Sequence, residues 1–221
     1  MTGGNEILYG RNVPIATPIT QPGSLAGGVR EAQRLQTRGR VFDAAVAEIG
    51  RFGLAGADVA AIAAAAGVAR GTFYFHFPTK EHVLVELERA EELTMVAMLD
   101  TGTTEPGDLT SMLSLLVRQV VAAELRLGPV VFRDMLGLHF TATRPVEDEL
   151  AEHPLLDFVI AAIGEAQTAG TVARGADAGE LAVIFLTGLF ALLATGVVAS
   201  SDRNALLDRY VTTIAEGMEA R

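Results

Sequence analysis

Apolar residues recur at helical spacings along most of this 221-residue chain, and the pattern predicts a protein built from helices. In the N-terminal half, Asp58 can cap a short helix that Gly67 stops in a left-handed conformation. Pro78 ends the next short helix, and Thr79 can cap a longer one. The helices expected in this half span residues 32–52, 58–66, 69–76 and 79–100.

The turn-rich stretch TGTTEPGD, residues 101–108, interrupts the helical pattern and marks the best internal boundary. Beyond it the pattern is helical again, with proline or glycine at or near the joins. No segment alternates apolar and polar residues convincingly with period two, so no sheet is expected and the predicted fold class is all-α. The helices expected here span about 109–127, 129–142, 147–169, 178–200 and 203–219.

Twenty uncharged residues follow one another from Leu181 to Ser200, a length that could cross a bilayer. No second segment of this kind occurs, however, and the flanks carry no excess of basic residues. Small residues also recur four positions apart, at Thr187, Ala191 and Thr195, where they would let another helix approach closely. The stretch is therefore interpreted as a buried helix at an oligomer interface, without a membrane partner. A membrane helix is the alternative.

The net charge of −10 is unevenly distributed along the chain. Residues 30–90 hold eight basic and seven acidic side chains, whereas residues 91–221 hold eight basic and nineteen acidic ones. The acidity therefore belongs to the C-terminal part and does not exclude a nucleic-acid partner for the N-terminal part. The chain has no cysteine, and residues 1–28 have no apolar run typical of a secretion signal, so a cytoplasmic protein is expected.

Four aromatic side chains fall within five consecutive positions, in a chain with ten Phe and three Tyr residues. On a helix, Phe73 and Phe77 lie one turn apart, as two core anchors would. Arg70 and Tyr74 share another side and are left to face outward. An arginine can bond guanine, a threonine such as Thr72 can contact a base edge, and a tyrosine can bond phosphate. The cluster could be plain core, but two short helices joined by a glycine turn fit a helix-turn-helix.

The run IAAAAGVARGTFYFHFPTKEHVL, residues 62–84, resembles the DNA-binding signature of the TetR (tetracycline-repressor) family of bacterial transcription regulators. Three positions depart from the family pattern. Ala69 replaces a serine that caps the recognition helix, Phe75 replaces a tyrosine, and Asp58 replaces a threonine. The residues that match the signature are Ile62, Ala63, Gly67, Val68, Gly71, Thr72, Tyr74, His76, Phe77, Lys80, Glu81 and Leu84.

Composition and the resemblance together predict four parts of the chain. Residues 1–29 are expected to form a disordered arm, and residues 30–78 a three-helix DNA-binding domain that contains the helix-turn-helix. Residues 79–100 would form a connecting helix, and residues 101–221 a larger helical domain for effector binding and dimerisation.

The resemblance also implies which residues meet DNA, some at bases or the nearby backbone and others at phosphates. Arg38 is added because it belongs to a basic stripe with Arg30 and Arg34, four positions apart, which could follow a phosphate backbone. A solvated basic face is the alternative for that stripe. The predicted DNA-binding residues are Arg70, Gly71, Thr72, Tyr74, Phe75, His76, Lys80 and Arg38.

No pattern in the C-terminal part is typical of catalysis, a metal site or a cofactor loop, so neither an enzyme nor a bound cofactor is expected. The resemblance implies a small apolar effector and a homodimer formed through the helices over 178–200 and 203–219. The candidate pocket residues, any of which could equally be plain core, are Met112, Leu116, Phe132, Met135, His139, Phe158 and Phe185.

The expected function is that of a ligand-responsive transcription regulator, specifically a repressor, which binds a palindromic double-stranded DNA operator as a dimer and is released by its effector. The alternative is a helical membrane-associated or protein-interaction module without DNA binding.

Overall fold

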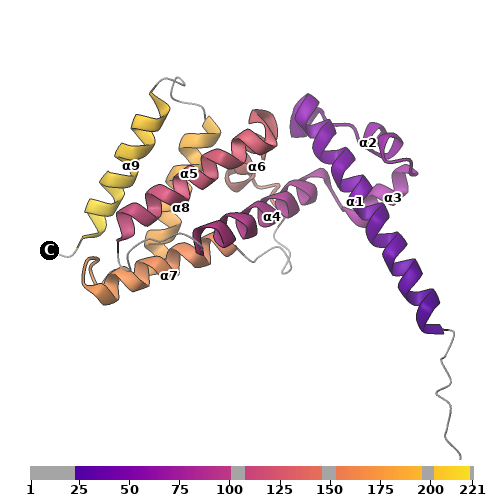
Figure 1. Cartoon of the computed structure of the whole chain (residues 1–221). Helices are drawn as coiled ribbons and strands as arrows, with labels where there is room; N and C mark the ends of the chain where they lie inside the picture. Colours follow the sequence, from indigo (N-terminus) through magenta and orange to yellow (C-terminus); the bar gives the residue numbers. More distant parts are fainter. Residues whose placement is uncertain (1–22, 101–107, 146–152, 196–201, 220–221) are drawn as a thin grey trace, which may run out of the picture. The chain divides into compact units, whose positions relative to one another are not determined.

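The computed structural model describes residues 23–100, 108–145, 153–195 and 202–219. Within these ranges the chain forms nine α-helices, one short 3₁₀-helix and no β-strand, which confirms the all-α class (Figure 1). An isolated antiparallel bridge joins Val172 to Glu219. The elements are α1 Gly23–Gly56, α2 Val59–Ala65, α3 Arg70–His76, α4 Lys80–Asp100, α5 Leu109–Leu127, α6 Pro129–Gly137, η1 Leu138–Phe140, α7 Pro154–Ala169, α8 Ala178–Thr195 and α9 Arg203–Met218.

Helix α1 begins earlier than the sequence pattern predicts. Residues 23–29, expected to belong to a disordered arm, are helical and continue into the amphipathic part of α1. Extending a helix that is already nucleated costs less free energy than starting one, so α1 extends beyond the residues that have the apolar pattern. Near the other end of α1, Gly53 has φ 72°, a value outside the helical region that glycine adopts more readily than other residues. The chain kinks at this glycine.

Helix α7 begins later than predicted. The expected helix over 147–169 starts at Pro154, and residues 146–152 lie outside the described part of the chain. A proline disfavours helical geometry in the residue before it and suits the first turn of a helix, which explains the start. The expected end of α8 at residue 200 also lies outside the described residues, since α8 is described to Thr195.

The chain divides into two compact units after Thr37, and the second unit contains both hydrophobic cores. The smaller core joins part of α1 to α2, α3 and the start of α4. Its anchors are Phe73 and Phe77, which are 0% and 1% exposed, as the helical spacing predicts. The Phe77 ring lies 6.1 Å from that of Phe42, and burying each such ring contributes about 2–3 kcal/mol. Other buried members of this core are Val41, Ala45, Val59, Ile62, Ala66 and Val83.

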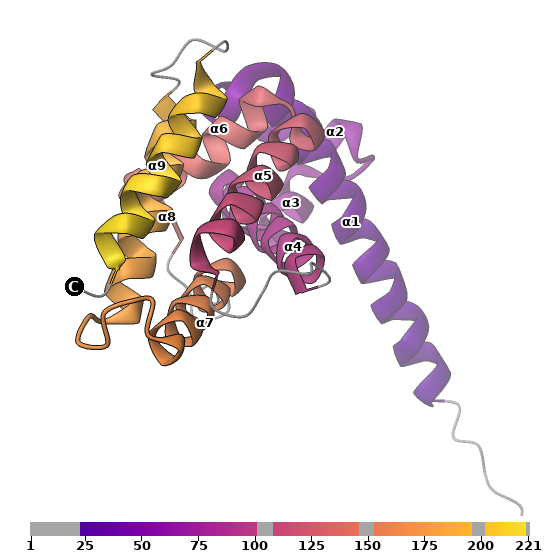
Figure 2. The ribbon, with the colours of Figure 1, turned by 60° about the vertical axis from the view of Figure 1, so that its left-hand side comes forward.

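The larger core is formed mainly by the helices that follow α3, and Ile49 of α1 joins it. Helix α4 packs against α5, α6 and α7, and it lies alongside α7 in both views (Figures 1 and 2). Helix α8 packs against α6, α7 and α9, and α9 also contacts α5. Among the described helices α8 is the one long and apolar enough to cross a bilayer, and 33% of it is buried inside this chain. These contacts make it a core helix of the bundle with one apolar side still uncovered.

Candidate functional site

The helix-turn-helix is formed by α2, a glycine turn and α3. The Asp58 carboxylate accepts a hydrogen bond from Ala60 N at 3.0 Å and caps α2, as expected. Gly67, at φ 67°, then turns the chain in a conformation that other residues adopt at a cost. Ala69 caps α3 without a side-chain hydrogen bond, so the cap that a serine would supply is missing.

The outward face of α3 carries the side chains that the sequence singled out for DNA. Tyr74 is 45% exposed and Phe75 is 72% exposed, while Phe73 between them in sequence is sealed in the core. The Arg70 guanidinium lies over the Tyr74 ring, 5.9 Å from its centroid, and Nη2 is 3.4 Å from the Tyr74 hydroxyl. At Gly71, an added Cβ would meet no described heavy atom within 4 Å, so this side of α3 is open for close approach.

His76 lies at the edge of this face and is half-buried. Its ring packs edge-on against Phe75, with the ring centroids 5.0 Å apart. Thr72 is partly exposed on the same short helix. The structure therefore brings together on α3 all the predicted DNA-binding residues except Lys80 and Arg38.

Lys80 is engaged inside the protein. Its ammonium donates hydrogen bonds to the carbonyl oxygens of Leu54 and Ala57, each at 2.7 Å, and lies 3.5 Å from that of Ala55. These carbonyls lie at the end of α1, where a helix leaves acceptors without partners and favours a cation. The sequence predicted a free ammonium for phosphate, whereas the structure uses it to fasten the start of α4 to the end of α1.

Arg38 is also engaged by other residues of the protein. Its guanidinium forms a two-pronged ion pair with the Glu86 carboxylate of α4, and it lies over the Phe77 ring, 4.5 Å from the centroid. The Arg38 side chain remains 33% exposed. Its charge therefore holds α1 to α4, and the predicted phosphate contact would have to compete with Glu86.

A second link joins the end of α1 to α6. Leu54 N, next to the kink at Gly53, donates a hydrogen bond of 2.6 Å to Asp134 Oδ2. A Cβ added at Gly53 would lie 3.2 Å from the same oxygen, so the kink also makes room for the carboxylate. No pattern in the sequence indicated this bond, because the partners are 80 residues apart.

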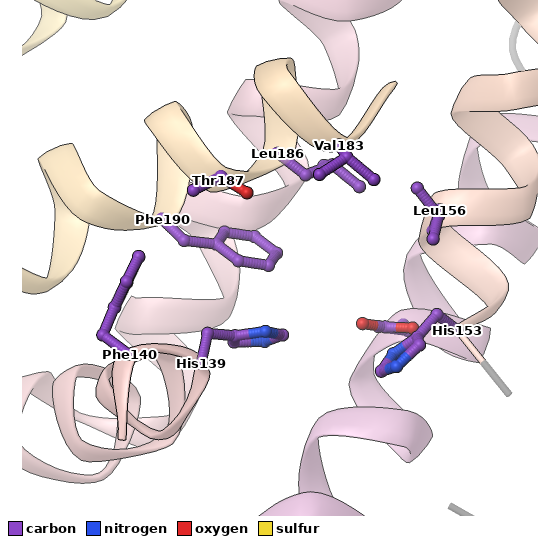
Figure 3. Close-up of a pocket in the computed structure, with 9 residues that line it drawn as sticks. His139, Phe140, His153, Leu156, Val183, Leu186, Thr187 and Phe190 are labelled. Carbon is purple, nitrogen blue, oxygen red and sulfur yellow. The ribbon is translucent and has the colours of Figure 1, made fainter. Parts of the chain in front are cut away.

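A cavity of about 230 Å³ opens in the larger core, between η1, α4, α7 and α8 (Figure 3). One side of it is apolar: Val183 and Leu186 approach from α8, and Leu156 faces them from α7 (Figure 3). His139 and Phe190 lie against each other, with ring centroids 4.8 Å apart. The residues that line the cavity are Glu92, His139, Phe140, His153, Leu156, Val183, Leu186, Thr187 and Phe190.

The predicted pocket residues and this cavity share only His139. Met112, Leu116, Phe132, Met135 and Phe185 are at most 9% exposed, and they fill the closed core of the bundle. Phe158 is half-buried and packs against the same core. The apolar pattern of the sequence predicts which side chains are buried, but it does not distinguish those that pack against one another from those that line a cavity.

Ionisable groups gather at the polar end of the cavity, and two of them are almost fully buried. Glu88 and Glu92 are each 4% exposed, one turn apart on α4. Glu88 forms ion pairs with His139 Nε2 and with Arg144 Nη2, the latter at 2.8 Å. Burial alone would raise the pKa of Glu88, but hydrogen bonding and charge attraction from His139 and Arg144 hold this pKa below its ordinary value.

Glu92 differs from Glu88 in its partners. Its Oε2 accepts a long hydrogen bond of 3.3 Å from Leu155 N in the first turn of α7. Burial, followed by repulsion from Glu88, raises the pKa of Glu92 to about 8. Burial also lowers the pKa of His153 at the cavity wall, with a smaller contribution from Arg144. At neutral pH the polar end therefore holds a protonated Glu92 and a neutral His153.

Sequence reasoning missed this polar end, although a signal for it was present. Glu88 and Glu92 occupy the same stripe of α4 as the buried Leu84, Met95 and Leu99. Two acids on the inward stripe of an amphipathic helix violate its pattern, and such violations mark functional sites more often than chance. The basic partners of Glu88, His139 and Arg144, are 51 and 56 residues away in sequence, and only the fold brings them together.

Comparison with known proteins identifies the N-terminal part of the chain. Residues 41–87 match the family of bacterial regulatory proteins named after TetR. The HTH-type transcriptional repressor KstR of Mycolicibacterium smegmatis is 41% identical over 78 residues, which make up 33% of this chain and 38% of that protein. The chain thus matches well under half the length of that relative.

Solved structures resemble the chain over most of its length. The TetR-family repressor FadR of Thermus thermophilus, in complex with lauroyl-CoA, superposes with a TM-score of 0.64 at 21% identity, over 83% of this chain and 96% of that one. The fatty acid degradation regulator FadR of Bacillus halodurans gives 0.59 at 24% identity, over 83% and 97%. Likenesses at these identities concern the fold. Residues 41–87 therefore match the helix-turn-helix part of the TetR family of bacterial regulatory proteins, and the chain shares its overall fold with solved structures of that family.

Proposed function

We propose that this protein is a cytoplasmic, ligand-responsive transcription regulator, and specifically a repressor that binds a palindromic DNA operator as a homodimer. The observation that carries the proposal is the outward face of α3, where Arg70, Thr72 and Tyr74 lie together above an anchored phenylalanine pair. An arginine fork suits guanine, and a threonine suits a base edge or a thymine methyl. The exposed Phe75 ring adds an apolar surface that could contact a thymine methyl or a sugar.

The dimer would form through α8 and α9. On the outer side of α8, Ile184 is 56% exposed, and the small side chains of Thr187, Ala191 and Thr195 follow at one-turn intervals, none of them buried. An apolar face of this kind, left uncovered in a single chain, supports a helix–helix interface with a symmetry mate. Two α3 helices related by such a two-fold axis would read successive major grooves about 34–36 Å apart.

The effector would act through α4. Lys80 at its start holds the end of α1, and Glu92 lines the cavity twelve residues further on, about 18 Å along the helix. The bond between Asp134 and Leu54 N gives α6 a second hold on α1. A ligand that moves α4 or α6 would change the spacing of the two α3 helices. It releases DNA only if it binds the released geometry more tightly than the DNA-bound one.

The DNA-binding proposal is tested by selecting bound sequences from random duplex DNA with the purified protein. A palindromic consensus is expected. Replacing Arg70→Ala and Tyr74→Phe together should weaken operator binding by at least tenfold, because each lost contact costs about 1–3 kcal/mol, while the far-UV spectrum stays unchanged. Arg174→Ala removes the same charge from an exposed loop residue and serves as the control. No enrichment of any sequence would refute the proposal.

The dimer is tested separately by light scattering. Ala191→Glu places a charge in the middle of the exposed α8 stripe, and it should shift the protein toward monomer and weaken operator binding. An unchanged dimer would place the interface elsewhere.

A further inference from the structure

The two buried acids near the cavity, Glu88 and Glu92, differ in their cationic partners. The carboxylate of Glu88 has two cationic partners, His139 and Arg144. Glu92, on the next turn of α4, forms no ion pair among the described residues and accepts one backbone hydrogen bond, from Leu155 N at 3.3 Å. Glu92 is 4% exposed as a residue, and it lines the cavity. Burying an acid without a paired cation lowers the stability of the fold, so a function for Glu92 would explain why the acid is present.

Two acidic groups, Glu88 and Asp157, disfavour a negative charge on Glu92, and Arg144 opposes them. The charged and titratable groups that face it are Glu88 on α4, His139 on η1, Arg144, His153 and Asp157 at the start of α7. The repulsion from Glu88 exceeds the attraction of Arg144. A ligand carboxylate or phosphate placed beside Glu92 would meet this repulsion, whereas a cation would be attracted.

The rest of the cavity suits the apolar part of a small ligand. Leu156, Val183 and Leu186 form one wall, and the aromatic rings of Phe140 and Phe190 stand near His139 on the other (Figure 3). Aromatic faces beside a carboxylate are favourable surroundings for an organic cation. At about 230 Å³ the cavity matches a ligand with one ring and a short chain.

We propose that the effector is a small amphipathic amine, whose ammonium group pairs with the Glu92 carboxylate while its apolar part lies along α8 and the ring of Phe190. This inference rests on the proposed function, in which the cavity is the effector site. On binding, Glu92 gives its proton to solvent, and the ligand ammonium takes the place of that proton beside the carboxylate. The raised pKa of Glu92, about 8, makes this exchange cost little near neutral pH.

The exchange predicts how affinity changes with pH. Since only ionised Glu92 pairs with the ammonium, the Kd should fall about eightfold between about pH 7 and about pH 8.5, a range in which an alkylamine stays protonated. A neutral ligand that accepts a hydrogen bond from protonated Glu92 would show the opposite trend and bind more weakly as pH rises.

The test uses three probes that share an apolar body: phenylbutylamine, phenylbutanol and phenylbutyrate. Binding to the full-length protein is measured by calorimetry and by the rise in melting temperature. We expect the amine to bind at least tenfold more tightly than the alcohol or the acid at about pH 8, with the stated pH trend. Glu92→Gln should abolish the preference and the trend above about pH 7, because the amide keeps an acceptor for Leu155 N but cannot become charged. Any pH dependence that survives in this variant belongs to groups other than Glu92.

Glu91→Gln is the matched control. Glu91 is the neighbouring acid on α4, but its carboxylate pairs with Arg126 at 2.6 Å, away from the cavity. This variant should bind the amine as the wild type does. Equal or tighter binding of the alcohol or acid, a reversed pH trend, or no binding of any probe overturns the inference. Operator binding, measured on the same preparations without probe, decides the proposed DNA-binding function independently.

Discussion

Gly188 on α8 is where the packing of the last two helices can be tested most sharply. A Cβ built at this position would overlap the Tyr210 hydroxyl of α9 and lie 3.0 Å from its Cζ and 3.1 Å from its Cε2. The hydroxyl cannot simply move away, because it donates a hydrogen bond of 2.6 Å to the carbonyl oxygen of Phe185. Burial of the same group raises the pKa of Tyr210 to about 12. The glycine therefore permits the close approach of α9 to α8 within one chain.

The cost of Gly188→Ala follows from three contributions. Overpacking costs about 1–3 kcal/mol. Loss of the Tyr210 hydrogen bond adds about 1 kcal/mol. The better helix propensity of alanine returns about 1 kcal/mol. The variant should therefore lose about 1–3 kcal/mol of unfolding free energy, which lowers the melting temperature by roughly 2–10 °C for a chain of this length.

The assay is urea unfolding followed by circular dichroism, at one fixed protein concentration because a dimer is stabilised by mass action. Gly164→Ala on α7 is the control, since a Cβ there meets no described atom within 4 Å, and it should be neutral or stabilise by up to about 1 kcal/mol. Combining Gly188→Ala with Tyr210→Phe should restore part of the loss, with a coupling of about 1 kcal/mol or more. If Gly188→Ala is as harmless as Gly164→Ala, or if the two changes are additive, the close packing of α9 on α8 is refuted.

Three further outcomes are expected. Lys80→Met should lower the unfolding free energy by about 1–3 kcal/mol through the lost bonds to the end of α1, and an unchanged stability in urea would contradict this role. Phe77→Ala should cost about 3–5 kcal/mol and the exposed Phe75→Ala less than about 1 kcal/mol, so equal effects would count against the described core. Because the folded-state pKa of Glu92, about 8, exceeds its ordinary 4.5, protonation of this carboxyl stabilises the fold fully below about pH 4.5, and this stability is lost as pH rises toward 8. The unfolding free energy of Glu92→Gln, measured by urea titration, should therefore rise relative to that of the wild type by about 1 kcal/mol per pH unit between about pH 5 and about pH 8. A difference in unfolding free energy that stays constant with pH would show that Glu92 is not a buried acid.

Some features could be predicted from the sequence because they depend on neighbours along the chain. The helix over 109–127 coincides with α5, and those at 58–66 and 69–76 correspond to α2 and α3, since local periodicity, an Asp cap and a glycine stop act within a few residues. The burial of Phe73 and Phe77 followed from their one-turn spacing in the same way. The start of α7 was predicted too early, since an acidic helical pattern was given more weight than Pro154.

What the sequence determined by itself is the helical class and the local geometry of the recognition helix, because both follow from interactions within one or two turns. Only the tertiary structure decided which charged side chains are paired within the protein. Lys80 and Arg38 look like phosphate contacts in the sequence, but the fold brings acceptors from 23 to 48 residues away against them. The cavity has the same origin: Glu92 meets the start of α7 and the side of α8 through long-range packing, and no pattern along the chain encodes which distant helix will face it.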